Sequence, residues 1–266
     1  MATHTQVLVV GQGLCGTWLC YWLQQAGIAH VVIDEERPHS STRVASGVIN
    51  PVTGRRMSVT WLADQIIPFA EQAYTAMTTL LANRQLLPAG PLIARCDIVD
   101  FFNSPDRRLD FEKKASQFAE YLQWPADEHA WRMLFHYELG FGSIAPAYQV
   151  DLQSMLDGWR AFLLQQNCLL PQRFDSSRLQ LTANGVQYAD LHAEKIIFAD
   201  GAAAAAAGYF QLLPFALNKG EALLIKAEGL PSDRIFKKGN TITPWRGGLH
   251  WAGSTYNNHF ADELPS

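Results

Sequence analysis

Residues 6–35 follow a pattern typical of a β-strand, a glycine turn, an amphipathic helix and a second β-strand. The apolar run Val7–Val10 leads directly into the pattern G-x-G-x-x-G. The residues of this glycine turn are Gly11, Gln12, Gly13, Leu14, Cys15 and Gly16. Glycine permits a tight turn, lets backbone approach a phosphate without a Cβ between them, and allows a helix to press against a sheet. Because a helix N-terminus also favours negative charge, the stretch predicts a dinucleotide-binding site.

The surroundings of the motif support this interpretation, which three glycines in a chain with 19 of them would not carry alone. Helical spacing is kept by the apolar side chains Trp18, Leu19, Trp22 and Leu23. Gly27 ends this helix, and a second apolar run, 31–33, ends at Asp34. A carboxylate there can accept hydrogen bonds from both ribose hydroxyls of an adenosine and disfavours a 2′-phosphate. The alternative is an ordinary βαβ unit whose glycines serve only in turns.

Composition narrows the class of protein. The chain has 266 residues, 48% hydrophobic and 17% charged, which suits one large domain or two interleaved ones. The net charge is −4, the pI is about 6.0, and lysine and arginine are scattered, so a small or neutral ligand fits better than nucleic acid. Glycines interrupt the apolar stretch 7–23 and no basic segment precedes it, so we expect neither a signal peptide nor a transmembrane helix.

Cysteine and histidine spacing bear on the compartment and on metals. The cysteines, which form no C-x-x-C pair, are Cys15, Cys20, Cys96 and Cys168. This favours the reducing cytoplasm. The eight histidines are dispersed, without H-x-E or H-E-x-x-H spacing, so we expect no metal site.

The middle of the chain mixes loop, helix and strand patterns. Residues 36–56 are rich in Ser, Thr, Gly and Pro and predict an ordered loop or crossing segment. Their small side chains would suit close approach to a large flat cofactor, and a plain surface loop is the alternative. Apolar residues three or four apart predict a helix over 58–82. The β-rich stretch 91–102 precedes Ser104-Pro105, an N-cap with a first-turn proline, so a helix should run to about residue 123.

The second half of the chain is dominated by strands. They are predicted over 148–150, 168–174, 178–182, 186–190, 195–199, 221–227, 234–238, 241–244 and 249–252. Asp151 marks the start of a helix that ends near Asn167. Asn184-Gly185 predicts a hairpin, which makes 168–190 a β-meander. The six alanines 202–207 predict the start of a close-packed helix.

Several of these segments together resemble one enzyme family. They are the stretch 11–35, the segment 42–51 (T-R-V-A-S-G-V-I-N-P), the strand end 196–201, and the runs 220–223 and 253–256. The combination resembles the D-amino-acid oxidase/glycine oxidase (DAO) family of FAD-dependent oxidoreductases, and it covers nearly the whole chain. The resemblance implies an α/β fold: an FAD/NAD(P)-binding Rossmann-like domain with an inserted β-meander, interleaved with an α+β substrate domain on an antiparallel sheet. Segments 1–82 and 148–215 would form the FAD-binding domain, and segments 83–147 and 216–266 the substrate domain.

The resemblance also implies roles for individual residues. Gly11, Gly13 and Gly16, with Leu14 and Cys15 in the same turn, would hold the FAD pyrophosphate. Asp34, with Glu35 beside it, would bind the adenosine ribose. A loop beneath the pyrophosphate and flavin would contain Thr42, Arg43, Ala45, Ser46 and Gly47. Backbone at Arg173 and Phe174 would meet the adenine, and Gly201 would lie near the phosphates. For Phe174, a place in the core of the meander is an equal alternative.

The activity implied is oxidation of a small amine or amino acid. A hydride would pass from the amine-bearing carbon to the flavin, the imine would be hydrolysed, and dioxygen would reoxidise the cofactor. Because FAD carries this chemistry, no acid–base pair is required, and the sequence assigns no catalytic residue. An arginine fork matches a substrate carboxylate, and Arg55, Arg56 and Arg246 are candidates.

Two other functions remain open at this point. An NAD-dependent dehydrogenase would use Asp34 equally well, but would not need the meander. The second alternative is a nucleotide-binding but inactive fragment, because the family usually continues through a further strand and a C-terminal loop beyond the place where residue 266 falls. On that view the last flavin contacts would be missing, and apolar surface with an open strand edge around 249–260 would favour self-association. A related branch, the oxidase domain of a bacterial tRNA-modifying enzyme, gains no support from the acidic charge balance.

Overall fold

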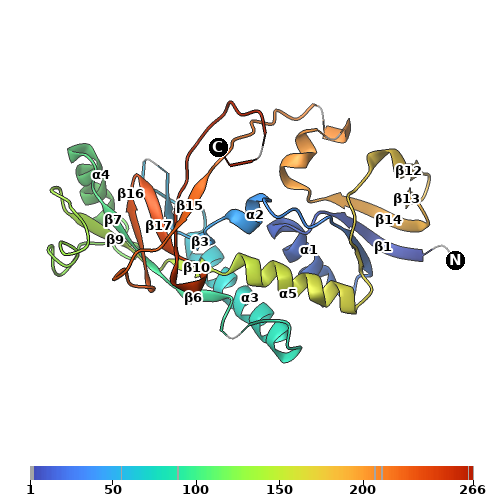
Figure 1. Ribbon diagram of the computed structural model, residues 1–266, viewed down its shortest axis with the longest axis horizontal. Coiled ribbons are helices and arrows are strands. Elements are labelled where there is room, and N and C mark those ends of the chain that lie inside the picture. The colour runs from blue at the N-terminus through green and yellow to red at the C-terminus, as the bar shows by residue number, and fades with distance from the viewer. Residues whose placement is uncertain are drawn as a thin grey trace. The chain divides into compact units, whose positions relative to one another are not determined.

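The computed structural model describes residues 3–54, 56–88, 90–206, 208–210, 212–262 and 264–265. They form two compact units. The first unit comprises Met1–Ala45, Thr79–Gly90 and Leu152–Leu217, and the second comprises Ser46–Thr78, Pro91–Asp151 and Asn218–Ser266. Most of their elements are labelled in Figure 1. Arg55 and Ala207, both named above, lie outside the described residues.

The first unit contains a six-stranded sheet with the strand order β11-β2-β1-β14-β13-β12. Its strands are β1 (Thr3–Val10), β2 (His30–Ile33), β11 (Leu169–Leu170), β12 (Leu179–Thr182), β13 (Gly185–Tyr188) and β14 (Leu191–Phe198). β1 pairs in parallel with both β2 and β14, and β11 pairs in parallel with β2. The apolar run Val7–Val10 is at most 6% exposed, because both faces of a central parallel strand are covered. β12, β13 and β14 form an antiparallel meander (Figure 1).

Among the described residues, the α-helices that lie wholly in this unit are α1 (Leu14–Gln25), α2 (Ser41–Val44) and α5 (Leu152–Gln165). α1 is followed by Gly27, whose φ of 68° and N–H···O bond of 3.1 Å to Gln24 are typical of a helix end. The apolar residues at helical spacing in α5 are buried, as predicted. These residues are Leu152, Leu156, Trp159 and Leu163.

The second unit is built on a seven-stranded sheet with the order β15-β18-β17-β16-β7-β9-β8. Its strands are β7 (Asp97–Phe101), β8 (Leu122–Gln123), β9 (Phe141–Ile144), β15 (Ala222–Ile225), β16 (Arg234–Lys238), β17 (Asn240–Pro244) and β18 (His250–Gly253). Neighbours are antiparallel except β7 and β16. Smaller strands are β3 (Val48–Ile49), β4 (Val52–Thr53), β5 (Ser58–Val59), β6 (Ile93–Arg95) and β10 (Tyr148–Val150). Helix α4 (Pro105–Ala115) lies in this unit, and α3 (Ala63–Asn83) has residues in both.

Two predicted helices are shorter than expected. α3 begins at Ala63 rather than at residue 58, because Ser58–Val59 pair with β4 as β5. α4 begins as predicted, with Ser104 Oγ accepting a hydrogen bond from the Arg107 N–H at 3.1 Å. It ends at Ala115 instead of near residue 123, because Leu122–Gln123 pair with β9. Pairing with a strand distant in sequence overrides local helical spacing.

Three further expectations are corrected. In 168–174, the strand Leu169–Leu170 joins the parallel side of the sheet rather than the meander. The predicted hairpin is present, but Thr182 pairs with Gly185, so the turn is Ala183-Asn184. The alanine run begins with a short 3-10 helix, Gly201–Ala205, and its first alanines, 202 and 203, are exposed rather than close-packed.

The strand edge expected around 249–260 is also placed differently. β18 has a neighbour on each side, β15 and β17. β15 is the last strand of the sheet, and its Leu223 is 70% exposed. The exposed edge is therefore Ala222–Ile225.

The predicted fold class is confirmed: one unit has a parallel sheet extended by a meander, and the other has a largely antiparallel sheet. The predicted boundaries followed residues 82, 147 and 215, whereas the observed segments end at 45, 78, 90, 151 and 217. The assignment of the units to cofactor and substrate stays a prediction. Among the described residues, no helix combines the length and apolar character needed to cross a lipid bilayer.

Candidate functional site

The carboxyl ends of the parallel strands bring Gly11 and Asp34 to one edge of the first unit's sheet. The Gly11 N–H donates to the Ile33 carbonyl at 2.9 Å, which joins the ends of β1 and β2. The Ala199 N–H donates to the Val10 carbonyl at 2.8 Å, and the Asp34 N–H donates to a carbonyl of β11 at 3.2 Å. Ligands of open α/β sheets bind at this edge, beyond the carboxyl ends of the strands.

The three glycines of the turn differ in what surrounds them. A Cβ on Gly11, whose φ is 96°, would lie 2.6 Å from the Ala199 carbonyl oxygen. A Cβ on Gly16 would lie 1.9 Å from the Gly11 carbonyl oxygen. A Cβ on Gly13 would meet only the Thr42 Oγ1, at 3.3 Å. Gly16 is therefore required by the packing of the turn itself and Gly11 by its contact with Ala199, just after β14, whereas Gly13 borders open space.

The first turn of α1 presents a positive helix end beside that space. Gly13 is the N-cap and has no side chain to bond the helix. The Leu14 N–H donates to Thr42 Oγ1 at 3.0 Å, so α2 supplies a partner for this end. Leu14 and Cys15 are exposed, and the first turn contains no acidic residue. The macrodipole and the remaining N–H groups favour an anion such as a pyrophosphate.

Asp34, at the end of β2, is held by three donors. Its Oδ2 accepts from the Gln12 N–H at 2.9 Å. Its Oδ1 accepts from the Glu36 N–H at 2.8 Å and from Arg160 Nη1 at 2.9 Å. Arg160 Nη2 donates to the Asp34 carbonyl at 3.2 Å. The carboxylate is thus fixed in place while its side chain keeps 20% exposure.

Arg160 is a site residue that the sequence analysis did not single out. It lies in α5 and also pairs through Nε with Glu36 at 2.9 Å, and its Nη1 lies 3.3 Å from Gln12 Oε1. A signal was present, because Arg160 follows Leu152 and Leu156 at steps of four and so falls on the buried face of the helix. A charged residue on such a face requires a partner, but the spacing cannot name it.

Arg43 links α2 to α5. Its guanidinium pairs with Asp157 at 2.7 Å and with Glu36 at 3.1 Å. Its carbonyl accepts from Gln153 Nε2 at 3.0 Å. Ala45 closes α2 and is half-buried. These bonds make Arg43 part of the support for the segment that follows β2.

The predicted residues Ser46 and Gly47 lie in the second unit. Gly47 has a φ of 74°, and a Cβ there would lie 2.1 Å from the Val150 carbonyl oxygen. The Val150 N–H donates to the Gly47 carbonyl at 2.9 Å. The Ser46 carbonyl accepts from Gln149 Nε2 at 3.4 Å. Backbone approach to β10 therefore explains why residue 47 is glycine.

Phe174 packs into the meander. Its ring stacks on Tyr188 with centroids 5.3 Å apart and meets the edge of Phe198 at 5.6 Å. The core alternative for its side chain is therefore what the structure shows. Its backbone, which was expected to meet the adenine, belongs to the loop after β11.

The remaining predicted positions are exposed. Glu35 is exposed and lies 3.8 Å from Arg37, and Arg173 is also exposed. Gly201 has a φ of 59° and open space at its Cβ position. It follows Asp200, whose pKa is raised by burial.

The structure gives no support for the arginines that the sequence offered as partners of a substrate carboxylate. Arg55 lies outside the described residues, and Arg56 is exposed. Arg246 pairs with Asp151 at 2.8 Å, so its fork is already engaged.

The second unit contains a cavity of about 170 Å³. Its lining comes from the segment after α2 and from β7, β16, β17, β18 and the residue that follows β18. The lining residues are Ser46, Val48, Asn50, Ile98, Ile235, Lys237, Thr241, Trp251, Gly253 and Ser254. Lys237 is the one charged residue among them.

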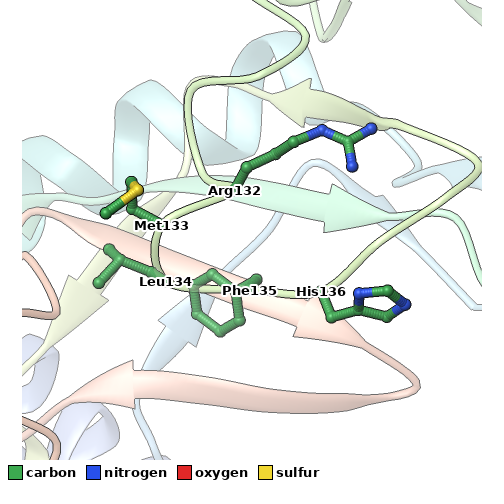
Figure 2. A pocket seen from close by; sticks show the side chains of 5 residues that line it. All are labelled: Arg132, Met133, Leu134, Phe135 and His136. Carbon is green, nitrogen blue, oxygen red and sulfur yellow. The ribbon is translucent and has the colours of Figure 1, made fainter.

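Another cavity of the same unit, of about 270 Å³, has a different character. Figure 2 shows that its lining, residues 132–136, belongs to a single loop whose side chains spread in different directions. Met133 is 96% exposed. Without polar groups that converge from several elements, this surface hollow does not qualify as a functional site. Among the described residues, no group of three or more His, Cys, Asp or Glu could hold a metal ion.

The first unit fits an adenine dinucleotide. The open position at Gly13, the N-terminus of α1 and the partly exposed Asp34 carboxylate match a pyrophosphate and an adjoining ribose in charge and in space.

Comparisons with known proteins agree with this geometry. The solved structure of glycine oxidase from Geobacillus kaustophilus has a TM-score of 0.75 at 18% identity, covering 96% of this chain and 72% of that one. Iminodiacetate oxidase from Chelativorans sp. BNC1 gives 0.70 at 16%, covering 94% and 72%. L-proline dehydrogenase from P. horikoshii gives 0.71 at 12%, covering 100% and 74%. At these identities the likeness shows a shared fold. The family model for FAD-dependent oxidoreductases (DAO) matches residues 6–266, and the chain therefore belongs to the DAO family of FAD-dependent oxidoreductases.

Proposed function

We propose that this FAD-dependent oxidoreductase oxidises the C–N bond of a small amine that carries a carboxylate, that is, a small amino acid. The observation that carries the proposal is the 170 Å³ cavity of the second unit, with its single cation. The names of the similar structures support it, since glycine, iminodiacetate and L-proline all combine an amine with a carboxylate.

The first unit would hold FAD through its adenosine diphosphate half. The N-terminus of α1 and the open side of Gly13 would receive the pyrophosphate, and Asp34 would bind the ribose. FAD, when bound, supplies a two-electron acceptor for the hydride that leaves the amine-bearing carbon. The protein's own contribution is to bind and orient the substrate.

The lining of the cavity suits an amino acid. Lys237 supplies an ammonium group, and neutral hydrogen-bonding groups come from Ser46, Asn50, Thr241 and Ser254. The Asn50 side-chain oxygen accepts from the Val52 N–H at 2.9 Å, which leaves its NH₂ to donate. These donors match a carboxylate.

The rest of the lining favours a substrate amine without charge. Four of the remaining lining residues are apolar, namely Val48, Ile98, Ile235 and Trp251, and the last is Gly253. No lining residue is a carboxylate that would stabilise a substrate ammonium. The uncharged amine, whose lone pair assists removal of the hydride, is therefore the favoured form.

A matched substrate panel tests this function. Glycine, sarcosine, L-proline and D-amino acids would be mixed anaerobically with the flavoprotein, beside methylamine, dimethylamine and pyrrolidine, which lack the carboxylate. We expect flavin bleaching with at least one amino acid, at concentrations where its decarboxylated partner gives none. Peroxide formation in air then distinguishes an oxidase from a dehydrogenase. Equal bleaching by both members of every pair, or by neither, would contradict the proposal.

Replacing Lys237 by methionine should raise KM for the amino acid and leave KM for the decarboxylated amine unchanged. A hydrogen bond to a charged group contributes about 1.5–3 kcal/mol, so KM should rise roughly tenfold or more. Lys237→Arg should recover part of the loss. The matched control is Lys238→Met, because Lys238 is the exposed next residue and donates to the His136 carbonyl at 3.2 Å. If the Lys237 variant keeps the native KM, this lysine does not bind the carboxylate.

The cysteines bear on the compartment of the protein, and the exposed strand β15 bears on its self-association. All four cysteines are free thiols, which supports the expectation of a reducing cytoplasm. Self-association, if it occurs, should use the exposed strand β15 rather than β18. Light scattering across a concentration series measures it directly.

A further inference from the structure

The Arg160 guanidinium is nearly removed from solvent, with 9% of its side chain exposed. A buried cation is tolerated only when it is paired and hydrogen-bonded. Arg160 meets this requirement through Asp34 and Glu36, both at 2.9 Å, and through the Asp34 carbonyl at 3.2 Å. These partners lie just after β2, and Arg160 Nη1 also lies 3.3 Å from Oε1 of Gln12 in the glycine turn.

The Asp34 carboxylate has little capacity left. A carboxylate offers about four acceptor positions, two on each oxygen. Oδ1 uses both of its positions, for the Glu36 N–H at 2.8 Å and for Arg160 Nη1 at 2.9 Å. Oδ2 uses one, for the Gln12 N–H at 2.9 Å. One position therefore remains, on Oδ2, and Arg160 is the only side chain among these three donors.

The network behind Arg160 makes it a rigid support. Glu36 is shared between Arg160 Nε and Arg43, and Arg43 also pairs with Asp157 of α5. Two guanidinium groups thus meet three carboxylates, which gives the network a net charge of −1. A second connection between the glycine turn and α5 is the hydrogen bond that Gln12 Nε2 donates to a backbone carbonyl of α5 at 2.9 Å. The helix is anchored by its buried apolar face, so α5 gives the Asp34 carboxylate a fixed side-chain donor beside the backbone N–H groups of Gln12 and Glu36.

We propose that Arg160 is the positioning residue for the adenosine end of the FAD site: it holds the Asp34 carboxylate so that the single free position on Oδ2 accepts one ribose hydroxyl. The proposal rests on the placement of the adenosine at Asp34 given above. Without Arg160, Asp34 would lose its one side-chain donor and the cation that lies between it and Glu36, so repulsion from Glu36 would displace its carboxylate although the two backbone donors remain. Arg160 therefore acts on the ligand through Asp34 and need not touch it.

The test compares two ligands that differ only in the ribose hydroxyls. Dissociation constants of ADP and of 2′,3′-dideoxy-ADP would be measured by calorimetry on the full chain freed of FAD, for the native protein and for Arg160→Met. We expect ADP to bind roughly tenfold or more weakly to the variant, because a charge-assisted hydrogen bond is lost. The affinity for dideoxy-ADP should stay unchanged, and a merely structural role would weaken both ligands equally.

A double-mutant cycle gives an independent readout. If Arg160 works through Asp34, the variant with Asp34→Ala and Arg160→Met should bind ADP no more weakly than Asp34→Ala alone. Arg160→Lys keeps the charge but not the fork, so it should recover part of the loss and serves if the methionine variant fails to fold. Arg84→Met is the control, because Arg84 contacts Phe162 of α5 at 4.9 Å and bears on neither carboxylate.

The outcomes distinguish the role of Arg160 from the placement of the ribose at Asp34, on which that role depends. If the native protein binds ADP and dideoxy-ADP equally well, the ribose does not lie at Asp34 and the proposal falls with that placement. If the native protein prefers ADP and the Arg160 variants lose both ligands alike, or neither, the placement stands and the role of Arg160 is overturned.

Discussion

Replacing Gly13 by valine should weaken FAD binding strongly while the chain still folds. A Cβ at this position meets only the side-chain atom Thr42 Oγ1, at 3.3 Å, so the protein can accept it if that side chain shifts by a few tenths of an ångström. The branched side chain would fill the space that the pyrophosphate needs beside the N-terminus of α1. We expect FAD affinity to fall by about 100-fold or more, which is about 2.7 kcal/mol. Loss of a glycine N-cap should cost stability only about 1 kcal/mol.

The measurement combines FAD titration with thermal unfolding of the FAD-free protein. Gly220→Val is a matched control, because a Cβ there meets its nearest atom, the Thr255 carbonyl oxygen, also at 3.3 Å. Gly220 belongs to the second unit and should leave FAD affinity unchanged. A Gly13 variant that binds FAD with native affinity in the titration would show that the pyrophosphate does not pass this glycine.

Replacing Gly16 by alanine, unlike replacing Gly13 by valine, should lower the stability of the fold itself. The added Cβ would lie 1.9 Å from the Gly11 carbonyl oxygen, a backbone atom that cannot rotate away. Overpacking typically costs about 1–3 kcal/mol and occasionally more. Alanine gains about 1 kcal/mol over glycine in a helix. Because 1.9 Å is far inside contact distance, we place the cost of this overlap above that typical range, at about 3–4 kcal/mol, and therefore expect a net loss of about 2–3 kcal/mol.

For a domain of this size, that loss corresponds to a decrease in Tm of about 4–12 °C. It should appear with and without FAD, since it arises inside the glycine turn. Gly13→Ala is the control, because the same substitution three residues earlier meets no backbone atom within 4 Å. An unchanged Tm for Gly16→Ala would mean that α1 can shift away from β1 at little cost, against the packing described here.

Family membership resolves the cofactor alternatives that the sequence left open. Asp34 suits NAD and FAD equally, so the glycine turn and its βαβ context could not choose between them. The match over residues 6–266 makes the protein an FAD-dependent oxidoreductase, as the combined motifs had suggested. The roles of individual residues toward FAD, and the substrate, stay predictions.

The sequence by itself determined the features whose physical cause lies in the neighbouring residues of the chain. Gly16 is required by a contact inside the glycine turn, and the unbroken apolar run Val7–Val10 already showed a buried parallel strand. Ser104 and Asp151 marked helix starts at α4 and α5, because capping preferences act within one turn. These features depend on neighbours a few residues apart, so spacing alone was enough to find them.

Only the tertiary structure decided the pairings between distant segments. Leu122–Gln123 became a strand because β9 offered it a partner, and Leu169–Leu170 joined the parallel sheet because β2 did. Arg160 reaches Asp34 across 126 residues of chain, and no local pattern encodes which carboxylate a buried arginine will meet. The cavity around Lys237 likewise draws its wall from strands far apart in the sequence. Hydrogen bonds and ion pairs form between groups that packing brings together, and packing is a property of the whole fold.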